Sequence, residues 1–274
     1  MISGFLQSWT MFRDAYLTAI LSGVLLSIIG VVVVARGQVF LAAAVAQAST
    51  LGTALALAYG WTQPALSSIG LGVAAAFVSE RRGARRNASE ERVAWVFLLA
   101  ASLSVLLVAN HAVGMKQVQA LLSSSLIGTG PLDVVMFGAL ALMVAVAVAL
   151  VRRRLVLLLS DATMAAAVGM NVAAWSWTFA SILGVAAGLS IRGSGLLFTF
   201  GCLALPPFIA RNLCRRTATL FLVAPILAVI GVVSGLILAH HFDFPPGQAI
   251  VAVLSVGLVL AWLGAGIRER FVST

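Results

Sequence analysis

Long apolar runs are the feature of this sequence that most constrains its fold. Stretches rich in Leu, Val and Ala recur along the whole length, and charged residues fall between them. A bilayer core about 30 Å thick requires roughly 20 helical residues for one crossing, so the chain has room for about eight to ten spans. Only 9% of its 274 residues are charged, which leaves too little polar material to cover a soluble domain. The sequence therefore predicts an integral membrane protein, with residues 1–274 forming a single transmembrane domain.

The continuity of the apolar runs indicates helices rather than strands. A transmembrane β-barrel would show short segments that alternate between apolar and polar residues. The predicted fold class is all-α, a polytopic membrane protein with about 8–9 transmembrane helices. We expect spans at residues 15–35, 40–59, 64–79, 93–110, 131–151, 171–190, 194–210, 217–239 and 247–267. Segment 112–130 is too polar for a full crossing and predicts an interfacial or re-entrant helix.

Basic residues collect between alternate predicted spans. Arginines of the SERRGARRNASEER loop, of the triplet Arg152 to Arg154 and of the ARNLCRR loop fall on one side, and the other side keeps only Arg13, Lys116 and Arg192. The positive-inside rule makes the basic side cytoplasmic. The net charge of +9 is therefore attributed to retained cytoplasmic loops, and not to nucleic-acid binding.

Carboxylates are excluded from the middle of the predicted spans. All eight Asp and Glu residues fall at or beyond span ends, so nothing obvious would take up a coupling proton or sodium ion. We therefore expect another subunit to supply the energy. The sequence has neither a phosphate-binding Walker loop nor a serine-nucleophile elbow, and this chain is expected to hydrolyse no ATP and to bind no cofactor of its own. Cys202 and Cys214 are interpreted as structural thiols.

The stretch LLSDATMAAAVGMNV, residues 158–172, differs from the apolar runs around it. It follows an arginine triplet, is rich in alanine and is too short to cross a bilayer. An acid at Asp161 suits the positive end of a helix dipole, and Gly169 suits a helix end. We predict a short cytoplasmic helix over about 160–170, and the residues alone leave open whether it docks a partner or only connects two spans.

Four motifs, in order, resemble those of permease subunits of ATP-binding-cassette (ABC) importers for zinc, manganese and iron ions. They are RGQVFLAAAVAQASTLGTALAL (residues 36–57), Ser160-Asp161-Ala162 leading to Ala166 and Gly169, GSGLLFTFGCLALPPFIARN (193–212) and DFPPG (243–247). The resemblance as a whole extends over roughly residues 20–270.

The resemblance implies a function and a set of partners. The chain would be a transmembrane permease for a divalent transition metal, zinc or manganese, and would pair with a second permease copy, either identical or related. Cytoplasmic ABC ATPases, which carry the ATP and Mg²⁺, would dock on a coupling helix that includes Asp161, Ala162, Ala166 and Gly169. A periplasmic or lipid-anchored solute-binding protein would deliver the cargo. Replacing Asp161 or Gly169 by a bulky basic residue is expected to uncouple the inserted protein from its ATPase.

The chain departs from the family where metal ligands are expected. The family's second-span Asp and His are Ala43 and Gln47 here, and the family proline is Leu51. Three explanations stay open: a heterodimeric partner supplies the ligands, the pathway conducts without binding, or the cargo is not a bare metal ion. An ABC permease for a chelated or organic cargo, a secondary carrier and, more distantly, an intramembrane enzyme are the alternative functions.

Other polar residues and prolines are candidates for the pathway and its control. Gln47, Ser49 and Thr50 would line the pathway, unless they only strengthen helix packing. His240, His241 and Asp243 would form an outer metal-uptake or docking site, unless they belong to an ordinary turn in which Asp243 caps the last span.

Pro206 and Pro207 are expected to break or kink their helix, either as a hinge or as a static kink. Glycine pairs such as Gly184 with Gly188 and Gly231 with Gly235 permit close helix contact, within the chain or at a dimer seam.

Overall fold

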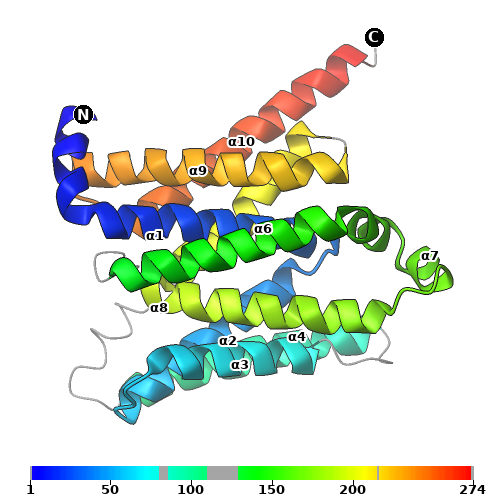
Figure 1. Cartoon of the computed structure of the whole chain (residues 1–274), viewed down its shortest axis with the longest axis horizontal. Helices are drawn as coiled ribbons and strands as arrows, with labels where there is room; N and C mark the ends of the chain where they lie inside the picture. The colour runs from blue at the N-terminus through cyan, green and yellow to red at the C-terminus, as the bar shows by residue number, and fades with distance from the viewer. Residues whose placement is uncertain (1, 80–85, 110–128, 215, 273–274) are drawn as a thin grey trace. The chain divides into compact units, whose positions relative to one another are not determined.

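The computed structural model describes residues 2–79, 86–109, 129–214 and 216–272, and within these ranges it consists of helices joined by short turns, without a strand. Contacts divide the chain into two compact units (Figure 1). One unit comprises Met1–Arg36, Leu126–Val156 and Gly201–Thr274, and the other comprises Gly37–Ser125 and Leu157–Phe200. Much of the predicted interfacial segment 112–130, together with residues 80–85 of the basic loop and Arg215, lies outside the described residues.

The first unit is built from long apolar helices around α9 (Thr217–Phe242). Its other elements are α1 (Ile2–Ala35), most of α6 (Pro131–Ser160), the second part of α8 (Val172–Leu213) and α10 (Pro246–Val272). Helix α9 packs against both α1 and α10. Its glycines Gly231 and Gly235 face Leu254 and Ile250 of α10, so this glycine pair serves a helix contact within the chain.

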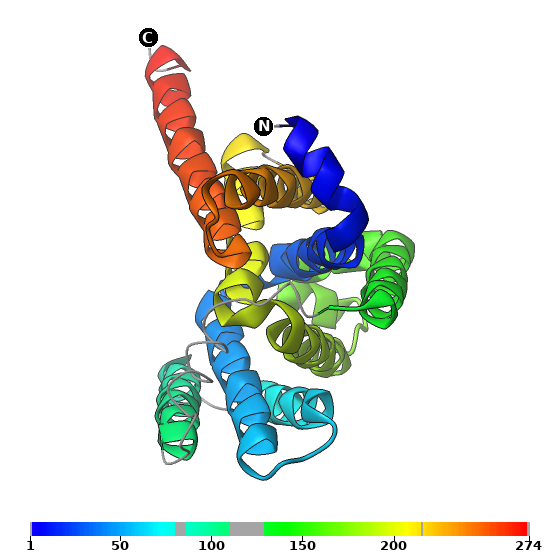
Figure 2. The same ribbon diagram turned by 90° about the vertical axis from the view of Figure 1, so that its left-hand side faces the viewer.

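The second unit contains α2 (Val39–Ala58), α3 (Pro64–Ser79), α4 (Arg86–Ala109), α7 (Ala162–Ala167) and the first part of α8. Helix α2 lies between α3 and α4 and packs against both (Figure 2). Gly184 and Gly188 of α8 face the backbone of Val73 and Ile69 in α3. This second glycine pair therefore also serves packing inside the chain, where the missing side chains let two backbones approach.

The all-α polytopic class is confirmed, while the number of long apolar helices is lower than predicted. Within the described residues, six helices are long and apolar enough to cross a membrane. Two features account for most of the difference: α3 has only 16 residues, and α8 is a single 42-residue element that covers two predicted spans. Each of the nine predicted spans nevertheless falls on a described helix.

Helix α8 is interrupted at Gly195, and not at its prolines. Gly195 has φ 79° and ψ 168°, values that lie outside the helical region and are accessible essentially only to glycine. The residue divides α8 into two arms, 172–194 and 196–213, each close to the length of one crossing. The helix is not broken at Pro206 and Pro207, where the backbone keeps helical φ and ψ, and a kink or hinge at these prolines stays a prediction.

The prolines still change the packing of their arm. Pro207 has no N–H, so the carbonyl of Leu203, four residues earlier, loses its helical partner. Gly30 of α1 lies directly against this carbonyl: a Cβ atom there would be 2.9 Å from the Leu203 carbonyl carbon and 3.0 Å from Pro207 Cγ. The freed carbonyl of Leu203 is thus covered by the backbone of Gly30, which has no side chain to keep the two helices apart.

The Gly195→Ala variant is expected to be less stable than the parent by about 1–3 kcal/mol, the cost of holding an alanine in this conformation. The measurement is the thermal unfolding midpoint in detergent. Gly138→Ala is the matched control, because a Cβ at Gly138 would meet only Leu21 Cδ1 at an ordinary 3.6 Å. Equal unfolding midpoints for the two variants would show that the conformation of Gly195 carries no strain for alanine.

Candidate functional site

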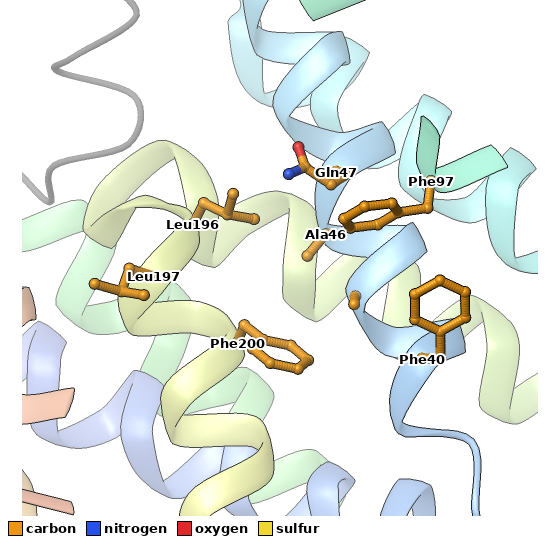
Figure 3. Close-up of a pocket in the computed structure, with 8 residues that line it drawn as sticks. Phe40, Ala46, Gln47, Phe97, Leu196, Leu197 and Phe200 are labelled. Atoms are coloured by element: carbon orange, nitrogen blue, oxygen red, sulfur yellow. The ribbon is translucent and has the colours of Figure 1, made fainter. Parts of the chain in front are cut away.

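A cavity of about 450 Å³ lies in the second unit, between helix α2 and neighbouring parts of α4 and α8. Figure 3 shows Gln47 on α2 and Phe200 on α8 on opposite sides of this space. We call it the Gln47 cavity, and its lining residues are Phe40, Ala43, Ala46, Gln47, Phe97, Leu196, Leu197 and Phe200.

The helical repeat explains how α2 contributes half of this lining. Ala43, Ala46 and Gln47 are separated by three and four residues, so they share one face of the helix. The small alanine side chains leave space that larger residues would fill. Phe40, one turn earlier, packs against Phe97 of α4 with ring centroids 5.5 Å apart. The residues from α8 begin directly after the break at Gly195.

Gln47 supplies the only polar side chain among the lining residues of this cavity. Its amide offers one carbonyl acceptor and two N–H donors, and no lining residue is ionisable. The cavity can therefore make apolar and aromatic contacts and a few hydrogen bonds. It contains no carboxylate, imidazole or thiolate to ligate a metal ion.

Ser49 and Thr50 lie in helix contacts rather than along this cavity. Both are buried, and the Thr50 hydroxyl donates to Ala46 O at 3.0 Å within α2. Ser68 Oγ of α3 lies 2.9 Å from Ser49 O and 3.0 Å from Gly188 O, so one hydroxyl links α2, α3 and α8. These contacts match the alternative in which small polar groups strengthen packing.

Helix α7 has the predicted start, with Asp161 as its N-cap. The Asp161 carboxylate accepts hydrogen bonds from the amides of Thr163 and Met164, at 2.9 Å and 3.1 Å, and from the Thr163 hydroxyl at 2.6 Å. The bonds from the Thr163 hydroxyl, the Met164 amide and the Thr163 amide, in that order, lower the pKa of Asp161 below its ordinary value. The carboxylate is therefore ionised, and the cap is formed, at neutral pH.

Helix α7 also has the predicted end. Gly169 has φ 85°, and the amides of Gly169 and Met170 donate to Ala166 O and Ala165 O, both at 3.0 Å. This pair of bonds is the Schellman arrangement, which satisfies the last carbonyls of a helix and requires a left-handed residue. Both ends of this short helix are thus fixed by hydrogen bonds.

The surface of α7 is almost completely exposed. Ala162 and Ala166 are exposed, whereas Ala165 is fully buried and anchors the helix. Met164 and Val168, one helical turn apart, are 56% and 68% exposed. The segment therefore presents apolar side chains on a geometrically fixed support, and the role of Asp161, Ala162, Ala166 and Gly169 in ATPase coupling stays a prediction.

The predicted outer site falls at the turn between α9 and α10. His240 and Asp243 line a smaller cavity of about 160 Å³ in the first unit, together with Phe12, Tyr16 and Phe244 among other residues. His241 does not line it and contacts the Phe242 ring edge-on. Asp243 is the left-handed C-cap residue of α9, with φ 56°, so it ends that helix and is not the cap of the last span. No group of three or more metal-ligating side chains occurs within the described ranges.

Buried polar residues of the described chain are all serine or threonine. The described carboxylates are exposed or half-buried. Together with the apolar spans and the exposed helix between two of them, these features define the class of the molecule as a multi-pass α-helical membrane protein.

The particular family follows from comparison with known proteins. The model of the ABC 3 transport family matches residues 8–265, so the chain belongs to this family, as its motifs indicated. The manganese transport system membrane protein MntC of Halalkalibacterium halodurans is 22% identical over 260 residues, 94% of this chain and 88% of that protein. MntB of Synechocystis, also described as a manganese transport system membrane protein, is 27% identical over 42% of this chain and 37% of its own length.

Solved structures share the fold. PsaBC from Streptococcus pneumoniae in complex with Fab superposes with a TM-score of 0.83 at 18% identity, over 96% of this chain and 95% of the matched chain. An inward-facing putative metal-chelate type ABC transporter gives a TM-score of 0.77 at 17% identity, over 94% of this chain and 89% of the matched one.

Sequence reasoning identified Gln47 but missed the other large residues of its cavity. Phe40, Phe97 and Phe200 lie in apolar runs, where an aromatic residue that lines a cavity has the same sequence signal as one in the core. No pattern in the sequence marks them.

Proposed function

We propose that this chain is the permease subunit of an ABC importer for a transition-metal cargo, with manganese or zinc as the metal. It resides in a bacterial inner membrane and receives its cargo from a periplasmic or lipid-anchored solute-binding protein. A second permease copy completes the pathway, and separate ATPase subunits bind Mg²⁺ and ATP and hydrolyse the nucleotide. The names of MntC and MntB support manganese.

The observation that carries this proposal is helix α7 in a member of the ABC 3 transport family. Its backbone geometry is fixed at both ends, while Met164 and Val168 remain exposed. Exposed apolar side chains on a rigid support favour docking of a partner protein over a simple connection between spans. The partner expected for this family is an ABC ATPase.

A secondary carrier receives no such support. Ion coupling ordinarily uses an ionisable residue inside the spans, and the buried polar side chains among the described residues are hydroxyls. We therefore assign the energy supply to the ATPase.

Copurification tests the proposal directly. The chain is extracted from membranes in mild detergent, and the ATPase activity of the copurifying material is measured with and without the solute-binding protein loaded with manganese or zinc. An ATPase that copurifies and is stimulated by the loaded binding protein is the expected result. A chain that transports its cargo without any associated ATPase would contradict the proposal and favour a secondary carrier.

A further inference from the structure

The Gln47 cavity has the chemistry of a site for a small organic molecule. Its volume of about 450 Å³ falls in the range of roughly 300–1,000 Å³ that is usual for such sites. Sites of this kind are lined mainly by apolar and aromatic side chains, with few polar groups that orient the ligand. Here three phenylalanines, two leucines and two alanines surround a single amide.

The same lining is unsuited to a bare divalent cation. Manganese and zinc ions in proteins are held by carboxylate oxygens, imidazole nitrogens or thiolates, and none of these groups lines the cavity. Moving an ion out of water is very costly unless charged or strongly polar ligands replace the lost hydration. One neutral amide from Gln47 does not replace the six or so water oxygens that such an ion would lose.

We infer that the Gln47 cavity accommodates a transition metal already enclosed in a neutral organic chelator. This inference rests on the proposed function, because it takes a transition metal as the cargo and specifies the form in which it crosses. The chelator keeps the coordination sphere of the metal complete, so the protein needs to supply no ligand. The apolar periphery of the complex contacts Phe40, Phe97 and Phe200, and a polar atom of the chelator hydrogen-bonds to the Gln47 amide.

The arrangement of side chains supports this division of roles. Figure 3 shows the Gln47 side chain on the α2 side of the space, with Leu196 and Phe200 projecting from α8. Phe40 and Leu197 are 50% and 42% exposed, so apolar surface is available to a ligand without rearrangement of the core. A single hydrogen-bonding group among apolar walls fixes the orientation of the chelate but does not displace the chelator from the metal.

Binding to the full chain in lipid nanodiscs tests the inference. The probes are cobalt(III) tris(acetylacetonate), a neutral complex that does not exchange its ligands, and the chloride salts of manganese and zinc. Metal retained by the protein is measured by mass spectrometry after gel filtration, and empty nanodiscs are subtracted. We expect saturable retention of the cobalt complex, with neither manganese nor zinc chloride retained above the empty discs.

Variants locate the binding to this cavity. Ala43→Trp fills the space and is expected to abolish retention of the cobalt complex. Gln47→Leu, which keeps the size of the side chain, is expected to weaken its affinity by about 2- to 10-fold, the effect of one hydrogen bond. Ala74→Trp is the control, because Ala74 is exposed on α3 and does not line the cavity. Gel-filtration profiles establish that each variant is folded.

Two outcomes would overturn the inference: saturable binding of bare manganese or zinc that Ala43→Trp removes, or no saturable binding of the cobalt complex to the folded parent. The assay contains no ATPase, so its result is separable from the proposed function. Failure of an ATPase to copurify would contradict that function, whereas cobalt-complex binding that Ala43→Trp removes would still support the assignment of the cavity.

Discussion

Replacing Gly169 by valine is expected to reduce ATP-dependent transport by the reconstituted complex about tenfold. A β-branched residue at the φ of 85° found here is strained by roughly 1–2 kcal/mol, and 1.4 kcal/mol corresponds to a factor of ten in an equilibrium. The strain removes the pair of hydrogen bonds that ends α7, so the surface of Met164 and Val168 loses its fixed geometry. Uptake of radioactive manganese or zinc into proteoliposomes, delivered with the solute-binding protein, measures the effect.

Asparagine provides the matched control at both ends of α7. Asparagine tolerates the left-handed conformation and is also a good N-cap residue, so Gly169→Asn and Asp161→Asn are expected to retain most transport. Asp161→Ala, which removes the capping oxygens, is expected to lose it. Normal transport by Gly169→Val and Asp161→Ala would show that the geometry of α7 does not matter for coupling.

The pH dependence of the cap follows from the lowered pKa of Asp161. A carboxyl whose folded pKa is depressed contributes stability above its unfolded value, which is ordinarily about 3.9. That contribution is lost as the pH falls through the lower folded pKa. Above about pH 5 the Asp161 carboxylate is ionised in both the folded and the unfolded state. The coupling of the permease to its ATPase is therefore expected not to vary with pH through Asp161 in that range.

Replacing Gly188 by valine is expected to destabilise the second unit strongly. A Cβ at this position would lie 2.7 Å from Ile69 Cα and 2.8 Å from Ile69 N, so the obstacle is backbone and not a flexible side chain. Overpacking of this kind costs about 1–3 kcal/mol, and the separation of α3 from α8 would also break the link from Ser68 to Gly188 O. Thermal unfolding in detergent and the yield of folded protein from membranes are the measurements.

Gly70→Val is the control for Gly188→Val. Gly70 is exposed on α3, one residue from Ile69, and a Cβ there would have no neighbour within 4 Å. Both variants carry the same substitution in the same pair of helices, so propensity effects are matched. If the two variants unfolded at the same temperature, close backbone approach at Gly188 would not be the reason for the glycine.

The positions of the helices could be predicted because burial in a bilayer leaves a simple signal. Each apolar run of suitable length corresponds to a described helix, and the acid and the glycine around residues 161–169 marked both ends of α7. The boundary predicted between the spans 171–190 and 194–210 corresponds to the interruption of α8 at Gly195, whereas a further break predicted at Pro206 and Pro207 is absent. Proline can be accommodated in a continuing helix when a glycine on a neighbour covers the freed carbonyl, and Gly30 does so here. That compensation comes from a distant part of the chain.

The cavity could be predicted only in part. The helical repeat rotates by about 100° per residue, so Ser49 is about 200° away from Gln47 and faces a different neighbour. This argument would have separated Gln47 from Ser49 without a structure. The contributions of Phe97 and Phe200 depend on how α4 and α8 pack against α2, and a helix that is apolar on all faces carries no pattern that specifies its neighbours.

The first arm of α8 joins α7 directly to the wall of the Gln47 cavity. Residues 172–194 form an uninterrupted helix that begins just after Met170 and ends at Gly195, beyond which Leu196 and Leu197 line the cavity. At 1.5 Å per residue this arm is about 35 Å long, and each residue inserted or deleted would turn one end relative to the other by about 100°. Many apolar sequences would form this arm, but its number of residues sets the angle between α7 and the wall of the Gln47 cavity. The length of the arm is therefore more tightly constrained than its composition.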